Sequence, residues 1–433
     1  MTRPQRLAAV LMLLYLTAPA PQAVAVAPPP VERSYLPPAT APTPPGPTEQ
    51  SGRCAAAPAA KSTAGEHLPS WNLSTVWPLS RGAGQTVAVI DTGVARHRLL
   101  PHLLPAGDYV SSGDGTQDCD GHGTAVAGII GSAPLGSFGG IAPESTIMAI
   151  RQSSNRFRLT ADRSTSGLGD VDTLARAVRT AADAGATVIN ISSVACQPVT
   201  EPLDDRALGA ALAYAVDVRN VVVVAAAGNL GGGCDKQNAV TSTAPDWEKV
   251  ESVVSPAWYD DYVLTVGSVR ADGAASQFSL AGPWVDVAAP GEDVVSLATA
   301  GDELTDTRPD DAQRRPLSGT SYAAPVASGV VALVRSRSPH LTAHQVMARI
   351  KDTARHPAGG WNPRVGHGVV DALAAVSADG PGLAAAAAAP QPAHPGASRQ
   401  AVDPLPRRIA VVGTVFCVVV ALALRALRLR THD

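Results

Sequence analysis

Three segments far apart in the sequence carry a carboxylate, an imidazole and a hydroxyl in surroundings that suit catalysis. Asp91 ends an apolar run, Val-Ala-Val-Ile, and is followed by Thr-Gly. His122 stands in Asp-Gly-His-Gly-Thr, ahead of a stretch of small and apolar residues. Ser321 stands in Ser-Gly-Thr-Ser-Tyr, where a stretch begins that is apolar on every side of a helix and is therefore expected to be buried.

These three side chains are the groups that nucleophilic catalysis by serine requires. A serine hydroxyl is a poor nucleophile at neutral pH, so it needs a histidine to take its proton and a buried carboxylate to hold that histidine in the right tautomer. At a helix N-terminus, Ser321 would also have a backbone N–H and the helix dipole close to a developing oxyanion. Asn229, after the run Ala-Ala-Ala-Gly, can donate a second hydrogen bond to that oxyanion. Gly319 lets a substrate backbone approach closely.

Each segment has a plainer interpretation when it is taken alone. The Asp-Thr-Gly at Asp91 also occurs in aspartic proteases and in ordinary turns. A histidine between two glycines, such as His122, is more often structural, and Ser321 can be a simple helix N-cap. The four residues in the order Asp, His, Asn and Ser are far more specific than any one segment.

The stretches between these residues alternate between strand-like and helix-like patterns. Short apolar runs, typical of strands buried on both faces of a parallel sheet, occur at 86–91, 146–150, 187–192 and 221–227. Helical patterns lie near 171–184, 203–218 and 342–354. This alternation predicts an α/β domain with a central parallel sheet flanked by helices. Such sheets bind ligands beyond the carboxyl ends of their strands, where Asp91, Ser192 and Asn229 fall.

Composition limits the classes of protein to which the chain can belong. Of the 433 residues, 45% are hydrophobic, which is enough for a large core and excludes wholesale disorder. The formal net charge of -3 gives no basic surface for nucleic acid. No Asp-rich loop is spaced like a calcium site, so we expect no metal and no cofactor. Four further histidines are expected on the surface: His97, His102, His344 and His356.

Both ends of the chain carry signals for export and membrane attachment. Residues 1–27 combine basic residues, a short apolar run and Ala-x-Ala sites, which predicts a cleaved secretory signal peptide, with an uncleaved anchor as the alternative. An uncharged run that is followed by arginines predicts one membrane span over 407–427, with a buried core helix as the alternative. The catalytic domain would then lie outside the cell membrane, and residues 428–433 would form a cytoplasmic tail.

Two segments rich in Pro and Ala separate these signals from the central domain. Residues 28–65 read as an N-terminal extension, 66–376 as the domain and 377–406 as a linker. The even number of cysteines in the exported part predicts two disulfides with three possible connectivities, and buried free thiols are the alternative. These cysteines are Cys54, Cys119, Cys196 and Cys234.

Over roughly residues 66–376 the sequence resembles the subtilisin-like serine proteases, the subtilases. The resemblance includes the three catalytic segments and further stretches at 140–143, 286–291 and 366–372. It implies a subtilisin-like fold in which Asp91 orients His122, and His122 acts as general base and then as general acid. It also implies that Ser321 is the nucleophile and Asn229 an oxyanion donor.

One departure from the subtilase pattern concerns the predicted substrate-binding residues. Family members often carry Ser-Leu-Gly in the segment that pairs with substrate, whereas this chain has Ser192, Ser193 and Val194. Together with Gly319, these residues would line the substrate site. A valine in place of the glycine narrows the specificity pocket, so we expect a preference for small residues or another restricted preference. Efficient cleavage after Phe or Leu in a digest of a peptide library would refute this hypothesis.

The N-terminal extension is too short and too rich in proline to fold into a compact inhibitory prodomain. We expect it to lie across the domain, with a Cys54–Cys119 disulfide beside His122 and a Cys196–Cys234 disulfide joining two loops near the site. Peptide mapping with and without reduction tests this pairing, and a Cys54–Cys234 peptide would overturn it.

The complete arrangement is similar to that of the mycosins, the membrane-anchored subtilases of actinobacterial type VII (ESX) secretion systems. This resemblance implies the ESX membrane complex as a partner and limited proteolysis of secreted protein substrates. Two other functions stay open at this point. The chain could be a structural subunit that stabilises the secretion complex, with incidental proteolysis, or a general cell-surface subtilase.

Overall fold

The structure is a computed structural model that describes residues 26–56, 59–60, 73–162, 167–231, 233–299, 303–309 and 313–378. Most of the predicted signal peptide and linker lie outside these ranges, and so does the predicted cytoplasmic tail. Within the described ranges no helix is both long enough and apolar enough to cross a membrane. The span predicted at 407–427 falls outside them and stays a prediction.

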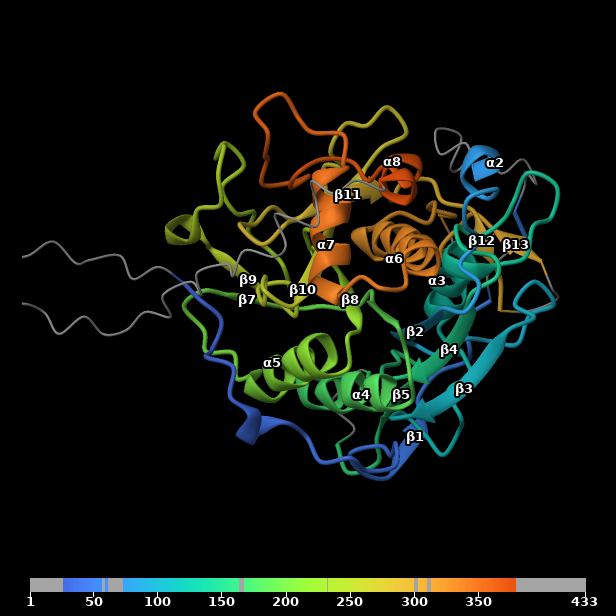
Figure 1. Ribbon diagram of the computed structural model, residues 1–433. Coiled ribbons are helices and arrows are strands. Elements are labelled where there is room, and N and C mark those ends of the chain that lie inside the picture. Colours follow the sequence, from blue (N-terminus) through green and yellow to red (C-terminus); the bar gives the residue numbers. More distant parts are fainter. Residues whose placement is uncertain are drawn as a thin grey trace, which may run out of the picture. The chain divides into compact units, whose positions relative to one another are not determined.

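A seven-stranded parallel sheet forms the centre of the domain (Figure 1). All neighbouring strands run in the same direction, so their carboxyl ends lie along one edge. In spatial order the strands are β11 (Val287–Pro290), β10 (Val263–Val269), β8 (Val222–Ala226), β6 (Val188–Ile191), β2 (Thr86–Asp91), β4 (Thr146–Arg151) and β3 (Leu103–Asp108).

The four strands predicted from the sequence are the adjacent strands β8, β6, β2 and β4. The other three have weaker patterns. Strand β3 lies at an edge, is largely accessible to solvent and contains Pro105, which lacks the N–H that an inner strand needs. Strand β10 is fully buried, but Thr265, Gly267 and Ser268 interrupt its apolar run. Strand β11 is short and ends at Pro290.

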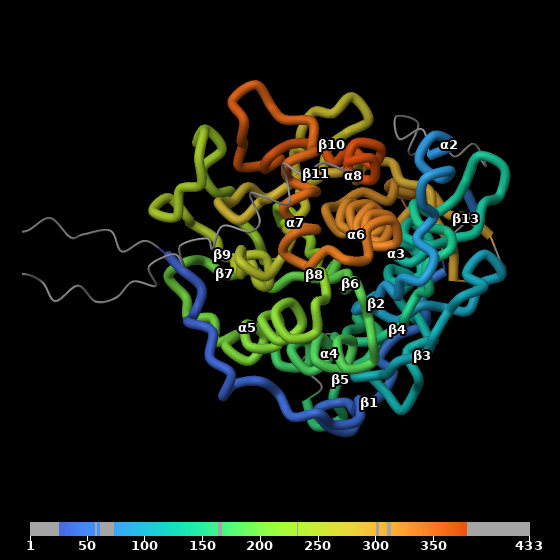
Figure 2. Tube along the Cα trace, viewed as in Figure 1, coloured from blue at the N-terminus to red at the C-terminus, as the bar shows by residue number. Residues whose placement is uncertain are grey.

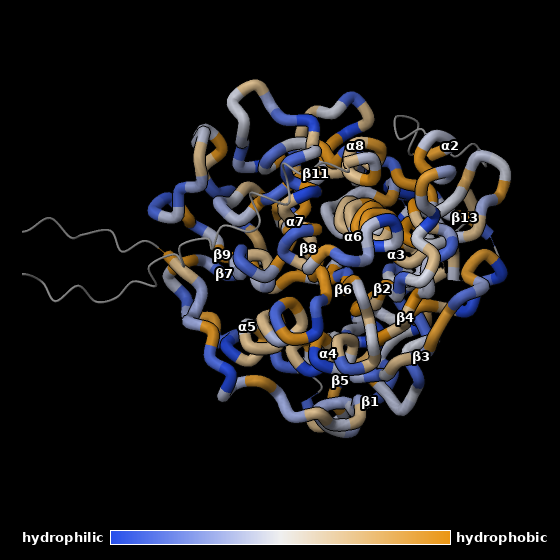
Figure 3. Tube along the Cα trace, viewed as in Figure 1, coloured by the Kyte–Doolittle hydropathy of each residue, from blue (hydrophilic) through white to orange (hydrophobic). Residues whose placement is uncertain are grey.

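Helices cover both faces of the sheet (Figure 1). On one face α4 (Val171–Asp183) packs against α5 (Arg206–Ala213), which continues as a π-helical turn, Tyr214–Val218. On the other face α3 (His122–Gly131) packs against α6 (Thr320–Arg337), and α7 (Ala343–Asp352) and α8 (Ala372–Ser377) contact α6. Fifteen of the residues of α6 are buried, as its apolar sequence predicts, and Figure 3 shows apolar residues along this helix.

The described part of the N-terminal extension runs along the outside of the domain, as predicted, and is drawn in blue in Figure 2. Its short helix η1 (Arg33–Tyr35) contacts α5, and the guanidinium of Arg206 lies 4.4 Å from the centre of the Tyr35 ring. The sequence did not predict β1 (Thr48–Gln50), which pairs antiparallel with β5 (Phe157–Leu159). The other regular elements among the described residues are the short helices α2 (Leu73–Val76) and η4 (Trp247–Lys249) and two small sheets. In one sheet β7 (Ala195–Pro198) pairs with β9 (Ser252–Ser255), and in the other β12 (Ser296–Leu297) pairs with β13 (Leu304–Thr305).

The structure has the disulfides Cys54–Cys119 and Cys196–Cys234, which are the pairs favoured from the sequence. One prediction about the surface is wrong. His97 is buried, with 8% of its surface exposed, because its Nδ1 accepts a hydrogen bond from the backbone N–H of Leu99 and so closes a turn. A histidine that caps a turn leaves no sequence pattern by which it can be told from a surface histidine.

Candidate active site

The predicted catalytic residues come together at the carboxyl edge of the sheet. Asp91 is the last residue of β2, Ser192 follows β6, and Asn229 follows β8. His122 and Ser321 lie in the first turns of α3 and α6, the two helices that pack together on one face. Three parallel strands and two helix N-termini therefore position the site.

Asp91 holds the imidazole of His122 by a short hydrogen bond of 2.7 Å between Oδ1 and Nδ1. The carboxylate is buried, with 2% of its surface exposed, and the backbone N–H of Thr92 also donates to Oδ1. Because an ionised carboxylate only accepts hydrogen bonds, Nδ1 must carry the proton. The other ring nitrogen, Nε2, is then free to take a proton from a nucleophile.

Negative charges around His122 set its proton affinity. Burial by itself lowers the pKa of His122, but the charge and the hydrogen bond of Asp91 outweigh it, with smaller contributions from Asp118 and Asp120, so the pKa is raised. About 30% of the side chain remains accessible to solvent. The raised pKa makes His122 a stronger base than a free imidazole, which suits a group that has to take a proton from a hydroxyl.

Ser321 lies in the first turn of α6, next to Tyr322, whose ring centre is 5.3 Å from that of His122. The backbone around Ser321 is fixed by a proline. Pro325 has no N–H to donate to the carbonyl four residues earlier, so the carbonyl of Ser321 is left for another donor. The hydroxyl of Ser192 donates to that carbonyl at 2.9 Å.

A chain of buried polar side chains continues from this contact into the domain. The amide of Asn190 donates to the Ser192 hydroxyl at 2.9 Å, and the hydroxyl of Ser328 donates to the Asn190 carbonyl at 2.8 Å. Ser192 is itself 6% exposed. Its side chain therefore anchors α6 to the end of β6.

The side-chain amide of Asn229 has only one orientation that satisfies its neighbours. The backbone N–H of Thr320 donates to Oδ1 at 2.9 Å, and the Thr320 hydroxyl lies 3.2 Å from the same oxygen. Because a backbone N–H can only donate, the oxygen of Asn229 must face Thr320. The NH₂ group is thereby turned toward the space beside Gly319 and Ser321.

Gly319 keeps that space open. A Cβ atom at this position would lie 3.1 Å from the Ser321 Oγ and 3.5 Å from the Asn229 Nδ2. The backbone there is extended, with φ of 161°, so a side chain would not strain it. The glycine is required for the room between the hydroxyl and the amide and not for its conformational freedom.

Gly319→Ala should therefore reduce reactivity without loss of stability. We expect roughly a 10- to 100-fold slower reaction with a fluorophosphonate probe, whose phosphoryl oxygen must enter this space. The free energy of unfolding should stay within about 1 kcal/mol of the wild type, because alanine tolerates an extended backbone. Gly359→Ala is the matched control, because its Cβ would make only an ordinary contact. Equal rates for both variants would contradict this account of Gly319.

The predicted substrate-binding residues Ser193 and Val194 form an irregular link between β6 and β7. Both are half-buried, and Val194 packs against the core. The Cys196–Cys234 disulfide joins β7 to the loop after Asn229. A Cβ added at Gly228 would lie 3.7 Å from the Cys196 sulfur, so this disulfide lies beside the loop that carries Asn229.

Sequence reasoning missed two residues of the site, Asp118 and Thr92. Both contact the first turn of α3, where Thr92 accepts from the N–H of Gly123 and Asp118 from that of Thr124. The short stretch Asp118-Cys-Asp-Gly-His122 was the available signal, since it places two acidic residues just before the catalytic imidazole. Within the described ranges no cluster of three or more His, Cys, Asp or Glu side chains could hold a metal ion.

Comparisons with known proteins agree with this geometry. Residues 82–368 match the Subtilase family, Peptidase_S8. Mycosin-4 of Mycobacterium tuberculosis is 54% identical over 415 residues, which cover 93% of this chain and 91% of the relative. Mycosin-1 of the same organism is 43% identical over 378 residues, which cover 83% and 84%.

Two solved structures are similar over most of the chain. The MycP3 protease from the type VII (ESX-3) secretion system has a TM-score of 0.77 and 44% identity, covering 82% of this chain and 100% of that one. A chain of an intact ESX-5 inner membrane complex has a TM-score of 0.77 and 38% identity, covering 92% and 99%. With the family match, these likenesses establish that the chain belongs to the subtilase family of serine proteases and, within it, to the mycosins.

Proposed function

We propose that this mycosin is a membrane-anchored, extracytoplasmic serine endopeptidase that cleaves secreted protein substrates of a type VII secretion system. The observation that carries the proposal is the 2.7 Å hydrogen bond between Asp91 and His122. It lies in a site where Ser321 stands in the first turn of a buried helix, beside the amide of Asn229 that Thr320 orients. This is the arrangement that activates a serine hydroxyl.

In the proposed reaction, His122 takes the hydroxyl proton of Ser321 at Nε2 while Oγ attacks the scissile carbonyl carbon. The carbonyl oxygen becomes an oxyanion, to which the NH₂ group of Asn229 and the backbone N–H of Ser321 donate. Asp91 stabilises the imidazolium, which then gives its proton to the leaving amine. A water molecule, deprotonated in the same way, hydrolyses the acyl-enzyme.

The substrate and the location follow from the relatives and from the two ends of the sequence. MycP3 is described as a protease from a type VII secretion system, and a similar chain belongs to an intact ESX-5 inner membrane complex. We infer a type VII membrane complex as the partner and secreted proteins as substrates. The predicted signal peptide and the predicted span at 407–427 support a single-pass protein with its catalytic domain outside the membrane. Val194 supports a restricted cleavage preference.

A second function is favoured by one observation. The likeness to the chain of the ESX-5 complex extends over 92% of this chain, which is more than the subtilase match at 82–368. Segments outside the catalytic domain are thus shared with a protein that sits in an assembled complex. This supports a structural role in a secretion complex, in addition to proteolysis or in place of it.

Labelling with a fluorophosphonate probe tests the proposed nucleophile without any known substrate. We expect the full chain to be labelled once, and the labelled peptide to contain Ser321. Labelling should cease after unfolding in denaturant, because the reactivity depends on His122 and Asp91. A label on another residue, or none on folded protein, would refute the proposed catalytic role of Ser321.

A further inference from the structure

The first turn of α3 has no cap of its own. Its N-cap residue is Gly121, which has φ of 84° and no side chain to accept a hydrogen bond. The N–H groups of the first turn of a helix need acceptors, and here they come from outside the helix. His122 is the first residue of this turn, so the acceptors that hold the turn also hold the imidazole.

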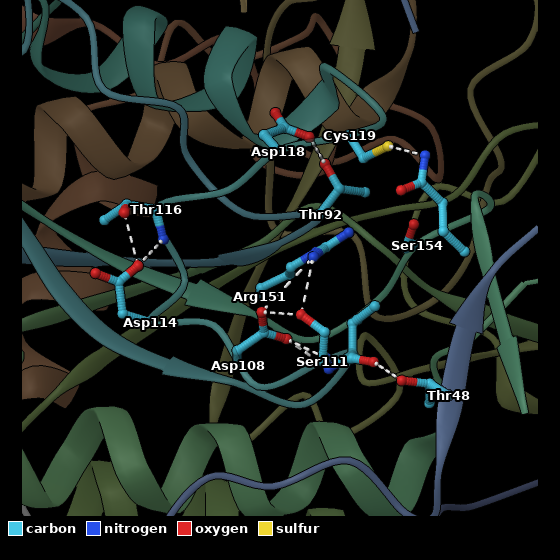
Figure 4. Close-up of polar contacts among 12 residues, drawn as sticks. Thr48, Thr92, Asp108, Ser111, Asp114, Thr116, Asp118, Cys119, Arg151 and Ser154 are labelled. Atoms are coloured by element: carbon cyan, nitrogen blue, oxygen red, sulfur yellow. Dashed lines mark hydrogen bonds and ion pairs between the residues drawn. The ribbon is translucent and has the colours of Figure 1, made fainter. Parts of the chain in front are cut away.

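Asp118 and Thr92 supply those acceptors. Asp118 Oδ2 accepts from the backbone N–H and the hydroxyl of Thr124 at 2.8 and 2.7 Å, and Oδ1 accepts from the N–H of Gly121 at 2.7 Å. The hydroxyl of Thr92 accepts from the N–H of Gly123 at 3.0 Å and donates to Asp118 Oδ1 at 2.8 Å. Figure 4 shows Thr92 and Asp118 joined by this hydrogen bond.

Asp118 and Thr92 also connect the first turn of α3 to Asp91, the residue that orients His122. Thr92 directly follows Asp91 in the sequence, and Asp91 accepts the hydrogen bond from Nδ1 of the imidazole. The loop with Asp118 is also fixed to the extension, because Cys119 is bonded to Cys54 and its carbonyl accepts from the N–H of Ala55 at 2.7 Å. Asp120 fixes the same loop to the domain itself, because it accepts from the N–H of Asn155 at 2.8 Å.

We propose that Asp118 is a positioning residue for His122: it caps the first turn of α3, holds the imidazole against Asp91 and places a negative charge near the ring. The proposal rests on the proposed function, since it assigns a role in activating Ser321. Asp118 does not touch the reacting atoms, and it acts through His122. A residue of this kind affects both the rate of the reaction and its dependence on pH.

The charged and titratable groups around His122 determine the direction of the pH effect. They are Asp91 on β2, Asp118 and Asp120 on the loop before α3, and Tyr322 on α6, with Arg308 near the Tyr322 hydroxyl. Burial raises the pKa of Asp118 to about 6, although four hydrogen-bond donors oppose it, so the side chain is largely ionised above neutral pH. Removing its charge makes the imidazolium less stable and lowers the pKa of His122.

The test is the rate of fluorophosphonate labelling of the full chain as a function of pH. Labelling requires neutral His122, so the labelling rate falls as the pH drops through the pKa of this residue. This acid limb of the profile of rate against pH therefore reports the pKa of His122. For Asp118→Asn we expect the plateau rate to fall by up to roughly 10-fold. We also expect the acid limb to move to lower pH by about 0.5 unit. Asp114→Asn is the matched control, because Asp114 caps Thr116 in the same loop without contacting α3.

A second pair of variants separates position from charge. Thr92→Val removes the hydroxyl but leaves the charge of Asp118, so the plateau rate should fall while the acid limb stays in place. Thr92→Ser should restore the rate. If Asp118→Asn does not fold, the two Thr92 variants provide the test. A lower plateau rate in Thr92→Val that Thr92→Ser restores supports the proposal, and an unchanged rate in Thr92→Val overturns it.

A wild-type plateau and an unshifted limb in Asp118→Asn would also overturn the proposal. Its failure is distinct from failure of the proposed function. The latter is judged by whether the label on the wild-type chain maps to Ser321, whereas the role of Asp118 is judged by the rate and pH dependence of that labelling.

Discussion

Replacing Ser321 by alanine is expected to lower peptide hydrolysis by about 10⁶-fold, the size of the loss when the nucleophile of subtilisin is removed. Without the hydroxyl, no acyl-enzyme forms, and only the oxyanion donors and substrate binding remain. The fold should persist, because the backbone carbonyl that accepts from Ser192 is kept and alanine is a good helix former. The measurement is hydrolysis of a peptide selected from a library digested by the wild-type chain.

Ser318→Ala is the matched control for this experiment. Ser318 stands in the same segment, and its hydroxyl accepts from the backbone N–H of Asp293 at the surface. It should keep activity close to that of the wild type. A Ser321→Ala protein that retains more than about one hundredth of the wild-type rate would mean that another group is the nucleophile.

The same variant separates the two functions in cells that contain the secretion system. If secretion continues in the Ser321→Ala strain and only the processing of substrates stops, the structural role is supported. If secretion fails while the complex is still assembled, proteolysis itself is required. Pull-down of the membrane complex with the variant distinguishes these results from simple loss of the protein.

The residues that do the proposed chemistry could be found from the sequence because each stands at the end of a regular element. Asp91 ends an apolar strand, Ser321 lies in the first turn of an apolar helix, and Asn229 follows an apolar strand. In a parallel sheet these ends lie at one edge, so the pattern alone predicts that the residues converge. The hydrogen bond from His122 to Asp91 agrees with that prediction.

The residues that orient the site could not be found in this way, because their contacts join distant parts of the chain. Thr320 turns the amide of Asn229 from 91 positions away in the sequence. Ser192 was predicted to bind substrate, yet its hydroxyl holds the Ser321 carbonyl, which Pro325 leaves without an intrahelical donor. Local patterns reveal a helix or a strand, but they carry no information about which distant side chain satisfies an exposed backbone group.

The second large effect is expected from Asp91→Asn, which should lower peptide hydrolysis by about 10⁴-fold, the size of the loss when the corresponding carboxylate of subtilisin is removed. The asparagine oxygen can still face both donors, the N–H of Thr92 and Nδ1 of His122. The tautomer is then kept, but the negative charge that stabilises the imidazolium is lost. The pKa of His122 falls, since Asp91 is the main group that raises it.

The residual activity of Asp91→Asn should therefore have an acid limb at lower pH than that of the wild type. The acid limb moves in this direction because the neutral imidazole is the active form. With a lower pKa, His122 stays neutral in more acidic solution. Asp272→Asn, which alters an exposed turn far from the catalytic residues in sequence, is the control and should leave both rate and limb unchanged. A loss of less than tenfold, or a limb that moves to higher pH, would show that Asp91 is not the charge that supports His122.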